Sequence, residues 1–162
     1  MKAEEIKTIV VIGAGAMGQQ IAMNTVMNGR EHSYKVILCD SFEGAIGKAE
    51  KWASDYLSGR VAKGRLTQEE ADKIADCLTI TKDVDTAVSE ADFIIEAIIE
   101  NLEIKRELFR KISRICRPDA VLGTNSSNIV SSRLADVTVN PERLLNIHYF
   151  NPALVMQLVE LV

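Results

Sequence analysis

The six residues GAGAMG (13–18) constrain the fold of this chain more than any other stretch. They directly follow a β-branched run, TIVVI (8–12), and apolar residues then recur at near-helical spacing through Val26. This pattern predicts a strand, a tight glycine turn and a helix. A second strand is expected over KVILC (35–39), and Asp40 follows it at once. In this setting a G-x-G-x-x-G loop is expected to bind a dinucleotide.

Each glycine of the loop has a separate expected role. Gly13 allows the tight turn, Gly15 omits a side chain that would block a pyrophosphate, and Gly18 lets helix and strand pack closely. The phosphates would meet the free N–H groups and the positive dipole of the helix N-terminus, beside Ala16 and Met17. A glycine turn that serves packing alone is the alternative.

Asp40 predicts which dinucleotide the loop takes. Its carboxylate can accept hydrogen bonds from an adenosine ribose hydroxyl and would repel a 2′-phosphate, so NAD is favoured over NADP. An S-adenosylmethionine methyltransferase also combines a glycine-rich loop with a following acid and remains an alternative. The connection over residues 28–36 is longer than a compact fold of this kind needs, and no function is assigned to it.

The rest of the chain alternates strands with helices. Such alternation predicts an α/β fold, a Rossmann-type doubly wound domain with a mostly parallel sheet, in one domain over 1–162. Further strands are expected over 78–81, 92–99 and 120–125. Helices are expected over 42–64, from a Thr67–Glu70 capping box through Ala75, as a short segment between the strands at 78–81 and 92–99, and from Asn101 to a point before Pro118.

Composition excludes several classes of partner. A net charge of −4 without a basic stripe argues against nucleic acid or an anionic membrane surface. The longest apolar runs are broken by charge far short of a bilayer span, so no membrane partner is expected and a cytoplasmic location is predicted. Three widely spaced cysteines indicate neither a disulfide framework nor a zinc site, and we expect reduced structural thiols and no metal.

The stretch NIHYFNPALVMQLVE (146–160) sets His148 and Glu160 among apolar residues. A lone histidine there could be a core residue satisfied by backbone. A carboxylate between two apolar residues is expected to be partly buried and to need a partner. The Asn151-Pro152 turn signal would fold the second segment back beside the first and bring imidazole and carboxylate together as a dyad.

Together, GAGAMG, ADFIIEAIIENLEIKRELF, LGTNSSNI and NIHYFNPALVMQLVE resemble the N-terminal half of the L-3-hydroxyacyl-CoA dehydrogenase family. The resemblance covers essentially the whole chain. It implies NAD-dependent oxidation of L-3-hydroxyacyl-CoA to 3-oxoacyl-CoA and the reverse reaction, on short chains such as 3-hydroxybutyryl-CoA. Related dehydrogenases of non-thioester hydroxy acids, such as carnitine or sugar acids, and a dinucleotide-binding module without chemistry are the alternatives.

The resemblance also implies catalytic residues. His148 matches the catalytic histidine and Glu160 its partner, which agrees with the need for a base that takes the hydroxyl proton as hydride leaves. Ser127 falls where the family has a serine near the substrate oxygen and the nicotinamide. Asn151 falls where an asparagine helps to bind the reacting group. As alternatives, Ser127 would cap the following helix and Asn151 would only form a turn.

Glu100, Lys105 and Asn125 match positions that line the cofactor in the family. Seen alone, Glu100 is an acid favoured by a helix N-terminus, and Lys105 is an ordinary solvated lysine. Asn125 lies in TNSSN, where relatives usually show S-N-T-S, so the contacts around Ser126 and Asn128 stay open.

Arg60, Lys63 and Arg65, near the end of the long helix, could meet CoA phosphates as that helical arm does in relatives. A solvated helix end is the alternative for these cations.

Relatives continue into an all-helical second domain that closes over the acyl chain and makes most of a dimer interface. This sequence ends two residues after Glu160, so the helical domain is expected to be absent. We therefore expect a chain that binds NAD with little turnover. The full-length protein is expected to be a homodimer through the missing domain, and part of the apolar 153–162 segment is expected to be exposed.

Overall fold

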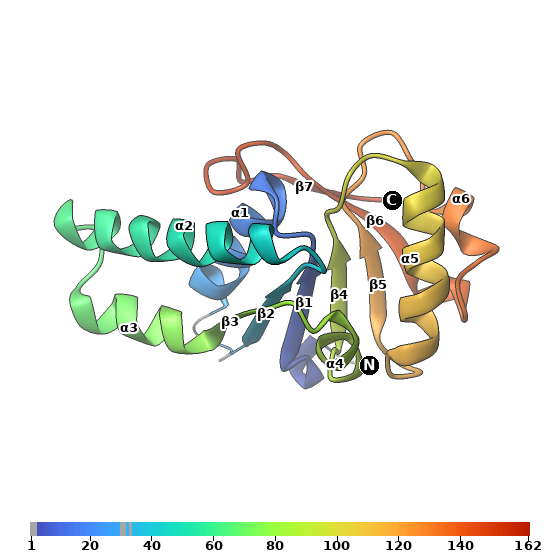
Figure 1. The fold of residues 1–162 in the computed structure, drawn as a ribbon, viewed down its shortest axis with the longest axis horizontal. Coiled ribbons are helices and arrows are strands. Elements are labelled where there is room, and N and C mark those ends of the chain that lie inside the picture. Colours follow the sequence, from blue (N-terminus) through green and yellow to red (C-terminus); the bar gives the residue numbers. More distant parts are fainter. Residues whose placement is uncertain (1–2, 30–31, 33) are drawn as a thin grey trace.

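The structure, a computed structural model, describes residues 3–29, 32 and 34–162, so the long connection over 28–36 lies partly outside the described residues. Strands and helices alternate as expected (Figure 1). The strands are β1 (Thr8–Ile12), β2 (Lys35–Cys39), β3 (Leu78–Thr81), β4 (Phe93–Glu96), β5 (Val121–Thr124), β6 (Leu144–Tyr149) and β7 (Val159–Leu161). The helices are α1 (Ala16–Asn28), α2 (Glu43–Ala62), α3 (Gln68–Cys77), α4 (Val84–Ser89), α5 (Leu102–Ile115) and α6 (Ser132–Ala135), with short 3₁₀ turns at Ala3–Glu5 and Pro141–Arg143.

The seven strands form one sheet in the order β3-β2-β1-β4-β5-β6-β7. Neighbours from β3 to β6 are parallel, and only β7 runs antiparallel, against β6. The chain starts near the middle, builds outward to β3, and then returns to build the other half. This order confirms the predicted Rossmann-type sheet, and the reversal between β1 and β4 marks its switch point.

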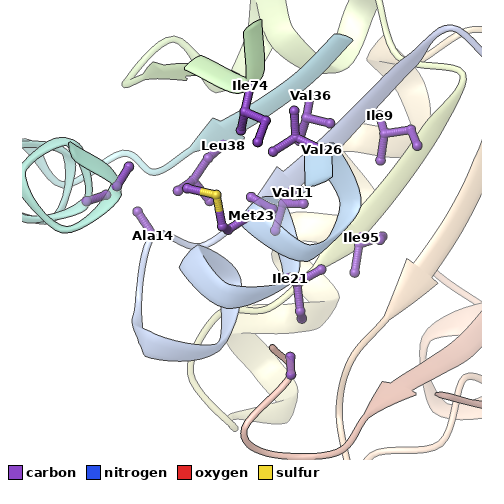
Figure 2. Packing of buried hydrophobic residues seen from close by; sticks show 14 of the residues in the cluster. Ile9, Val11, Ala14, Ile21, Met23, Val26, Val36, Leu38, Ile74 and Ile95 are labelled. Atoms are coloured by element: carbon purple, nitrogen blue, oxygen red, sulfur yellow. The ribbon is translucent and has the colours of Figure 1, made fainter. Parts of the chain in front are cut away.

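Helices cover both faces of the sheet, because successive strand residues point to opposite sides. On one face, Val11 and Leu38 pack with residues of α1, α2 and α3 such as Met23 (Figure 2). On the other face, Val10 packs with residues of α4, α5 and α6 such as Phe109. Strands buried on both faces explain why their sequences are almost continuously apolar.

The helices α2 and α3 form a hairpin that reaches beyond the sheet (Figure 1). The predicted capping box begins α3: the Glu70 N–H donates to Thr67 Oγ1 at 3.2 Å, and the Thr67 N–H donates to Glu70 Oε2 at 2.8 Å. The helix runs to Cys77, slightly past the expected end at Ala75. None of the helices in the described ranges is long and apolar enough to cross a bilayer.

The predicted strand over 92–99 is too long. β4 ends at Glu96, because the Ile98 N–H donates to the Glu96 side chain (Oε1, 2.7 Å) instead of to a neighbouring strand. The Ala97 N–H still donates to the carbonyl oxygen of Ile12 in β1 at 2.7 Å, but residues 98 and 99 leave the sheet, and Ile99 is exposed. The departing segment forms a wall of the cleft described below.

The three cysteines are free thiols, as expected. Cys39 and Cys116 are buried, whereas Cys77 is partly exposed. Burial, and secondarily the negative charges of Asp40 and Asp83, raise the pKa of the Cys39 thiol to about 12. Because the thiolate is the reactive form, Cys39 is protected by both its burial and its protonation.

We therefore predict that iodoacetamide at pH 8 labels Cys77 in the folded chain and leaves Cys39 unlabelled, as measured by peptide mass spectrometry. The same treatment in denaturant should label both residues. Rapid labelling of Cys39 under native conditions would contradict its burial beneath the glycine turn.

Candidate active site

A cleft of about 760 Å³ lies at the carboxyl ends of β1, β2, β4 and β5, beside the switch point of the sheet. Doubly wound sheets bind their ligands at this position. The cleft brings together most of the residues predicted for the cofactor site and one predicted for catalysis. These are Gly13, Gly15, Ala16, Met17, Asp40, Glu100, Lys105, Asn125 and Ser127.

The three glycines of the loop have the geometry that their expected roles require. Gly13 has a φ of +110°, and a Cβ there would lie 2.5 Å from the carbonyl oxygen of Ala97. A Cβ on Gly18 would lie 1.7 Å from the carbonyl oxygen of Gly13. A Cβ on Gly15 would meet nothing within 4 Å. Gly13 and Gly18 are thus required by the protein's own packing, whereas Gly15 leaves open space on the cleft.

The N-terminus of α1 faces the cleft without a side-chain cap. Gly15 is its N-cap residue, and the first turn holds no acid. The N–H groups of this turn and the positive end of the helix dipole are therefore available to an anion. Together with the open space at Gly15, they fit a pyrophosphate.

Asp40 lies at the end of β2 and is oriented by backbone. Its Oδ2 accepts the Ala14 N–H at 2.9 Å, and its Oδ1 accepts the Phe42 N–H at 2.9 Å. Each carboxylate oxygen can accept a further hydrogen bond, so both remain available to ribose hydroxyls. The position and charge of Asp40 thus fit the adenosine end of NAD.

A buried ion pair, which was not predicted from the sequence, lies beneath the side of the cleft formed by β4 and β5. Glu96 and Lys105 are 0% and 1% exposed, with Nζ 2.5 Å from Oε1. Thr124 Oγ1 donates to Glu96 Oε2 at 2.7 Å. Lys105 is therefore not the solvated lysine of the alternative interpretation. The sequence did hold a signal for this ion pair: Glu96 ends an apolar strand, and a buried carboxylate there requires partners.

Glu100 extends this network to the cleft surface. Lys105 Nζ lies 3.4 Å from Glu100 Oε2, while the Ser126 hydroxyl and the Asn128 N–H donate to Glu100 Oε1. Partial desolvation works to raise the pKa of Glu100, but these hydrogen bonds and the Lys105 charge outweigh it and hold the pKa below its usual value. Glu100 is thus a carboxylate at neutral pH. Ser126 and Asn128 thus both bind Glu100.

Asn125 joins the cleft to β6. Its N–H donates to the Glu96 carbonyl oxygen at 2.8 Å, and its Oδ1 accepts the Tyr149 N–H at 2.8 Å. Ser127 is exposed in the cleft, where its Oγ accepts Asn128 Nδ2 at 3.2 Å. The alternative that Ser127 caps the next helix is wrong, since the N-cap of α6 is another serine and α6 has no side-chain cap.

His148 and Glu160 face each other across the antiparallel pair β6 and β7. Nδ1 of the imidazole lies 3.3 Å from Oε2 of the carboxylate, so the predicted fold-back through Asn151 and Pro152 is confirmed. His148 pairs with a side chain and is 24% exposed, so it is not a core histidine. The expected burial of Glu160 is wrong. Its side chain is 57% exposed, because β7 is an edge strand whose residues are all exposed.

Other predicted residues lie outside the cleft lining. Gly18 is packed beneath the turn, and Asn151 is exposed in the turn after β6. Lys63 is exposed at the end of α2, as is Arg65. Arg60 lines a separate cavity of about 470 Å³, with its guanidinium 6.0 Å from the centre of the Tyr56 ring.

Comparison with known proteins agrees with this geometry. Residues 8–162 match the family model described as "3-hydroxyacyl-CoA dehydrogenase, NAD binding domain". The chain belongs to this family. NAD is accordingly its cofactor, and the open glycine, the uncapped helix and Asp40 fit it.

Among curated relatives, the chain is 38% identical to 3-hydroxyadipyl-CoA dehydrogenase of Escherichia coli (strain K12), over 97% of this chain and 32% of that protein. It is 35% identical to a probable 3-hydroxybutyryl-CoA dehydrogenase of Bacillus subtilis (strain 168), over 98% and 53%. The crystal structure of 3-hydroxybutyryl-CoA dehydrogenase from Escherichia coli K12 superposes with a TM-score of 0.89 at 37% identity, covering 97% of this chain and 32% of that one. The chain thus spans a third to a half of these relatives.

The contrast between Gly15 and Gly18 predicts two distinct defects. Gly15→Ala should cost less than about 1 kcal/mol of unfolding free energy, yet weaken NADH binding about tenfold or more, because its methyl group enters the space for the pyrophosphate. Gly18→Ala should cost about 3 kcal/mol, because its methyl group meets a carbonyl. Urea unfolding and NADH fluorescence titration measure both. Equal destabilisation by the two variants would contradict this assignment.

The buried ion pair predicts non-additive stability. Lys105→Met or Glu96→Gln alone should lower the unfolding free energy by about 3–5 kcal/mol, because each leaves a buried partner uncompensated. The double variant should be less destabilised than the sum of the two, as measured by urea unfolding. The exposed pair Lys51–Asp55 is the matched control and should show a coupling of at most about 0.5 kcal/mol. Additive losses at Glu96 and Lys105 would show that the pair is not coupled.

Proposed function

We propose that this chain is the NAD-binding part of an enzyme that oxidises L-3-hydroxyacyl-CoA to 3-oxoacyl-CoA, and catalyses the reverse reaction, with His148 as the acid and base. The observation that carries the proposal is the pairing of His148 with Glu160 on strands tied to the cofactor cleft. Asn125 makes that tie, since it lines the cleft and binds the Tyr149 N–H, next to His148 in the chain. Family membership supports the choice of substrate class.

The geometry assigns a separate task to each nitrogen of the imidazole. Nδ1 faces the Glu160 carboxylate, so it carries the proton in the tautomer that the pair favours. Nε2 then has a free lone pair and takes the proton of the substrate hydroxyl. As the ring becomes an imidazolium, Glu160 stabilises its charge and keeps its orientation. In the reverse direction, Nε2 returns the proton to the developing alkoxide.

Residues of the cleft hold the cofactor for this step. NAD, when bound, accepts the hydride from the carbon that carries the hydroxyl. Asp40 and the α1 N-terminus bind the adenosine and pyrophosphate end. Glu100 and Ser127, on the β4 and β5 side of the cleft, face the nicotinamide end and the substrate oxygen. Asn151, in the turn after His148, binds the reacting group.

The remaining assignments follow the same family. The substrate is a short-chain thioester such as 3-hydroxybutyryl-CoA, in line with the name of the Bacillus relative. Lys63 and Arg60, on the arm of α2, meet the CoA phosphates. Residues 1–162 form one domain with little turnover by itself, and the whole protein is a homodimer. Several apolar side chains near the β7 edge, such as Leu158 and Leu161, are exposed, which agrees with a contact surface there.

The direct test of the proposal is the oxidation of L-3-hydroxybutyryl-CoA by the polypeptide that carries this chain. We expect NADH to form at 340 nm with this thioester and not with carnitine or a sugar acid. His148→Gln should lower kcat by about 100-fold or more, because the base is lost, while the Kd for NADH stays the same. The matched control is His32→Gln, on the only other histidine of the sequence, which should leave both quantities unchanged.

Three outcomes would reject the proposal. Undiminished turnover in His148→Gln would remove the assigned base. Oxidation of the free hydroxy acids with none of the thioester would favour a dehydrogenase of another substrate class. If NADH binds but no alcohol is oxidised even by the full-length polypeptide, a dinucleotide-binding module without chemistry is the better description.

A further inference from the structure

Asn146 is a buried polar residue on β6 whose side chain makes three hydrogen bonds to one loop. The residue is 6% exposed. Its Oδ1 accepts the Ser131 N–H at 2.6 Å, and its Nδ2 donates to the carbonyl oxygens of Ser126 at 3.3 Å and Ile129 at 3.2 Å. Both amide protons and one lone pair are therefore used, and all three partners are backbone groups.

The loop that Asn146 holds is part of the cofactor cleft. Residues 125–131 connect β5 to α6, and the first four of them line the cleft. Asn146 binds this loop at both its cleft end, through Ser126, and its far end, through Ser131. The loop has few backbone partners of its own, so side chains such as Asn146 and Glu100 determine its path.

Asn146 also lies on the strand that carries the proposed base. Residues two apart on a strand point to the same side, so Asn146 and His148 share a face of β6. The backbone of Asn146 pairs with Val162, as His148 pairs with Glu160. One side chain thus joins the loop of Ser127 to the strand of His148.

We propose that Asn146 is a positioning residue for the nicotinamide half of the cofactor site, setting the distance between the loop of Ser127 and the strand of His148. This inference rests on the proposed function, because the roles of Ser127 and His148 belong to it. Asn146 itself does not line the cleft. It acts through the backbone of residues 126–131.

The inference predicts that changes at Asn146 weaken binding of the nicotinamide half of NADH and leave binding of the adenosine half unchanged. Asn146→Asp keeps the acceptor for the Ser131 N–H. Its second carboxylate oxygen would face the carbonyl oxygens of Ser126 and Ile129, and this contact is repulsive. We expect NADH binding to weaken about tenfold, because NADH must then order a loop that has lost its buried hydrogen bonds. Binding of AMP, which reaches only Asp40 and the α1 N-terminus, should change less than twofold. Fluorescence titration and calorimetry on this chain measure the two affinities.

Two further variants separate positioning from general instability. Asn146→Ala removes the same bonds without adding charge, and it decides the question if Asn146→Asp does not fold. Ser113→Ala is the matched control, because Ser113 is 4% exposed and its hydroxyl likewise holds a loop N–H, that of Val139, away from the cleft. It should lose comparable stability in urea and keep both affinities.

The outcomes distinguish this inference from the proposed function. Weaker NADH binding with unchanged AMP binding in both Asn146 variants supports it. Unchanged NADH binding in a folded Asn146→Ala, or equal losses for NADH and AMP, would overturn it while leaving the cofactor site intact. A wild-type chain that binds neither ligand would overturn the cofactor site and this inference with it. In the active polypeptide, Asn146→Ala should lower kcat, whereas Ser113→Ala should not.

Discussion

The side of the cleft formed by β4 and β5 depends on the buried carboxylate of Glu96. A charge that is fully removed from water is tolerated only if its oxygens are satisfied. Here the ammonium of Lys105, the hydroxyl of Thr124 and the N–H of Ile98 satisfy both of them. These partners come from α5, from β5 and from the segment after β4. The requirement of one carboxylate therefore fixes the relative positions of three elements whose ends form the cleft, which hydrophobic packing alone would leave less specific.

The side of the cleft formed by β1 and β2 depends on a steric constraint instead. Gly13 and Gly18 approach neighbouring backbone so closely that no side chain fits at either position. This contact sets α1 directly behind β1, with its uncapped N-terminus at the switch point. Asp40 contributes to the same turn, since it accepts the N–H of Ala14 as well as facing the cleft. One side of the cleft is thus built by the absence of side chains and the other by buried charge, and the two meet where Gly13 packs against the backbone of Ala97, next to Glu96.

This difference explains how much could be read from the sequence. The side built by glycines is encoded locally. Its signals are glycines at fixed spacing, a flanking strand and an acid after the next strand, and all of them lie within about thirty residues. GAGAMG and Asp40 therefore predicted this part of the cofactor site. The charged half is not local. Lys105 looks like any helical lysine until the fold brings it beneath β4, and Asn146 looks like an ordinary strand residue until its loop is in place. The partners of these side chains lie far apart in the sequence and meet only because of the fold. They therefore leave no periodic or regularly spaced sequence pattern that could predict the contacts.

The pair of His148 and Glu160 shows a third case, in which the sequence predicted the contact but not its environment. Strand register brings the two side chains together, because His148 lies opposite Glu160 in the antiparallel pair β6 and β7. Burial does not follow from register, because β7 is an edge strand. At 57% exposure, the carboxylate interacts with the imidazole through a medium of high dielectric, where an ion pair contributes little. The same pair would interact more strongly if substrate or protein excluded water from this edge. In the proposed reaction, the two side chains are therefore aligned before binding and would interact most strongly in the covered complex, which would couple proton transfer to occupancy of the site.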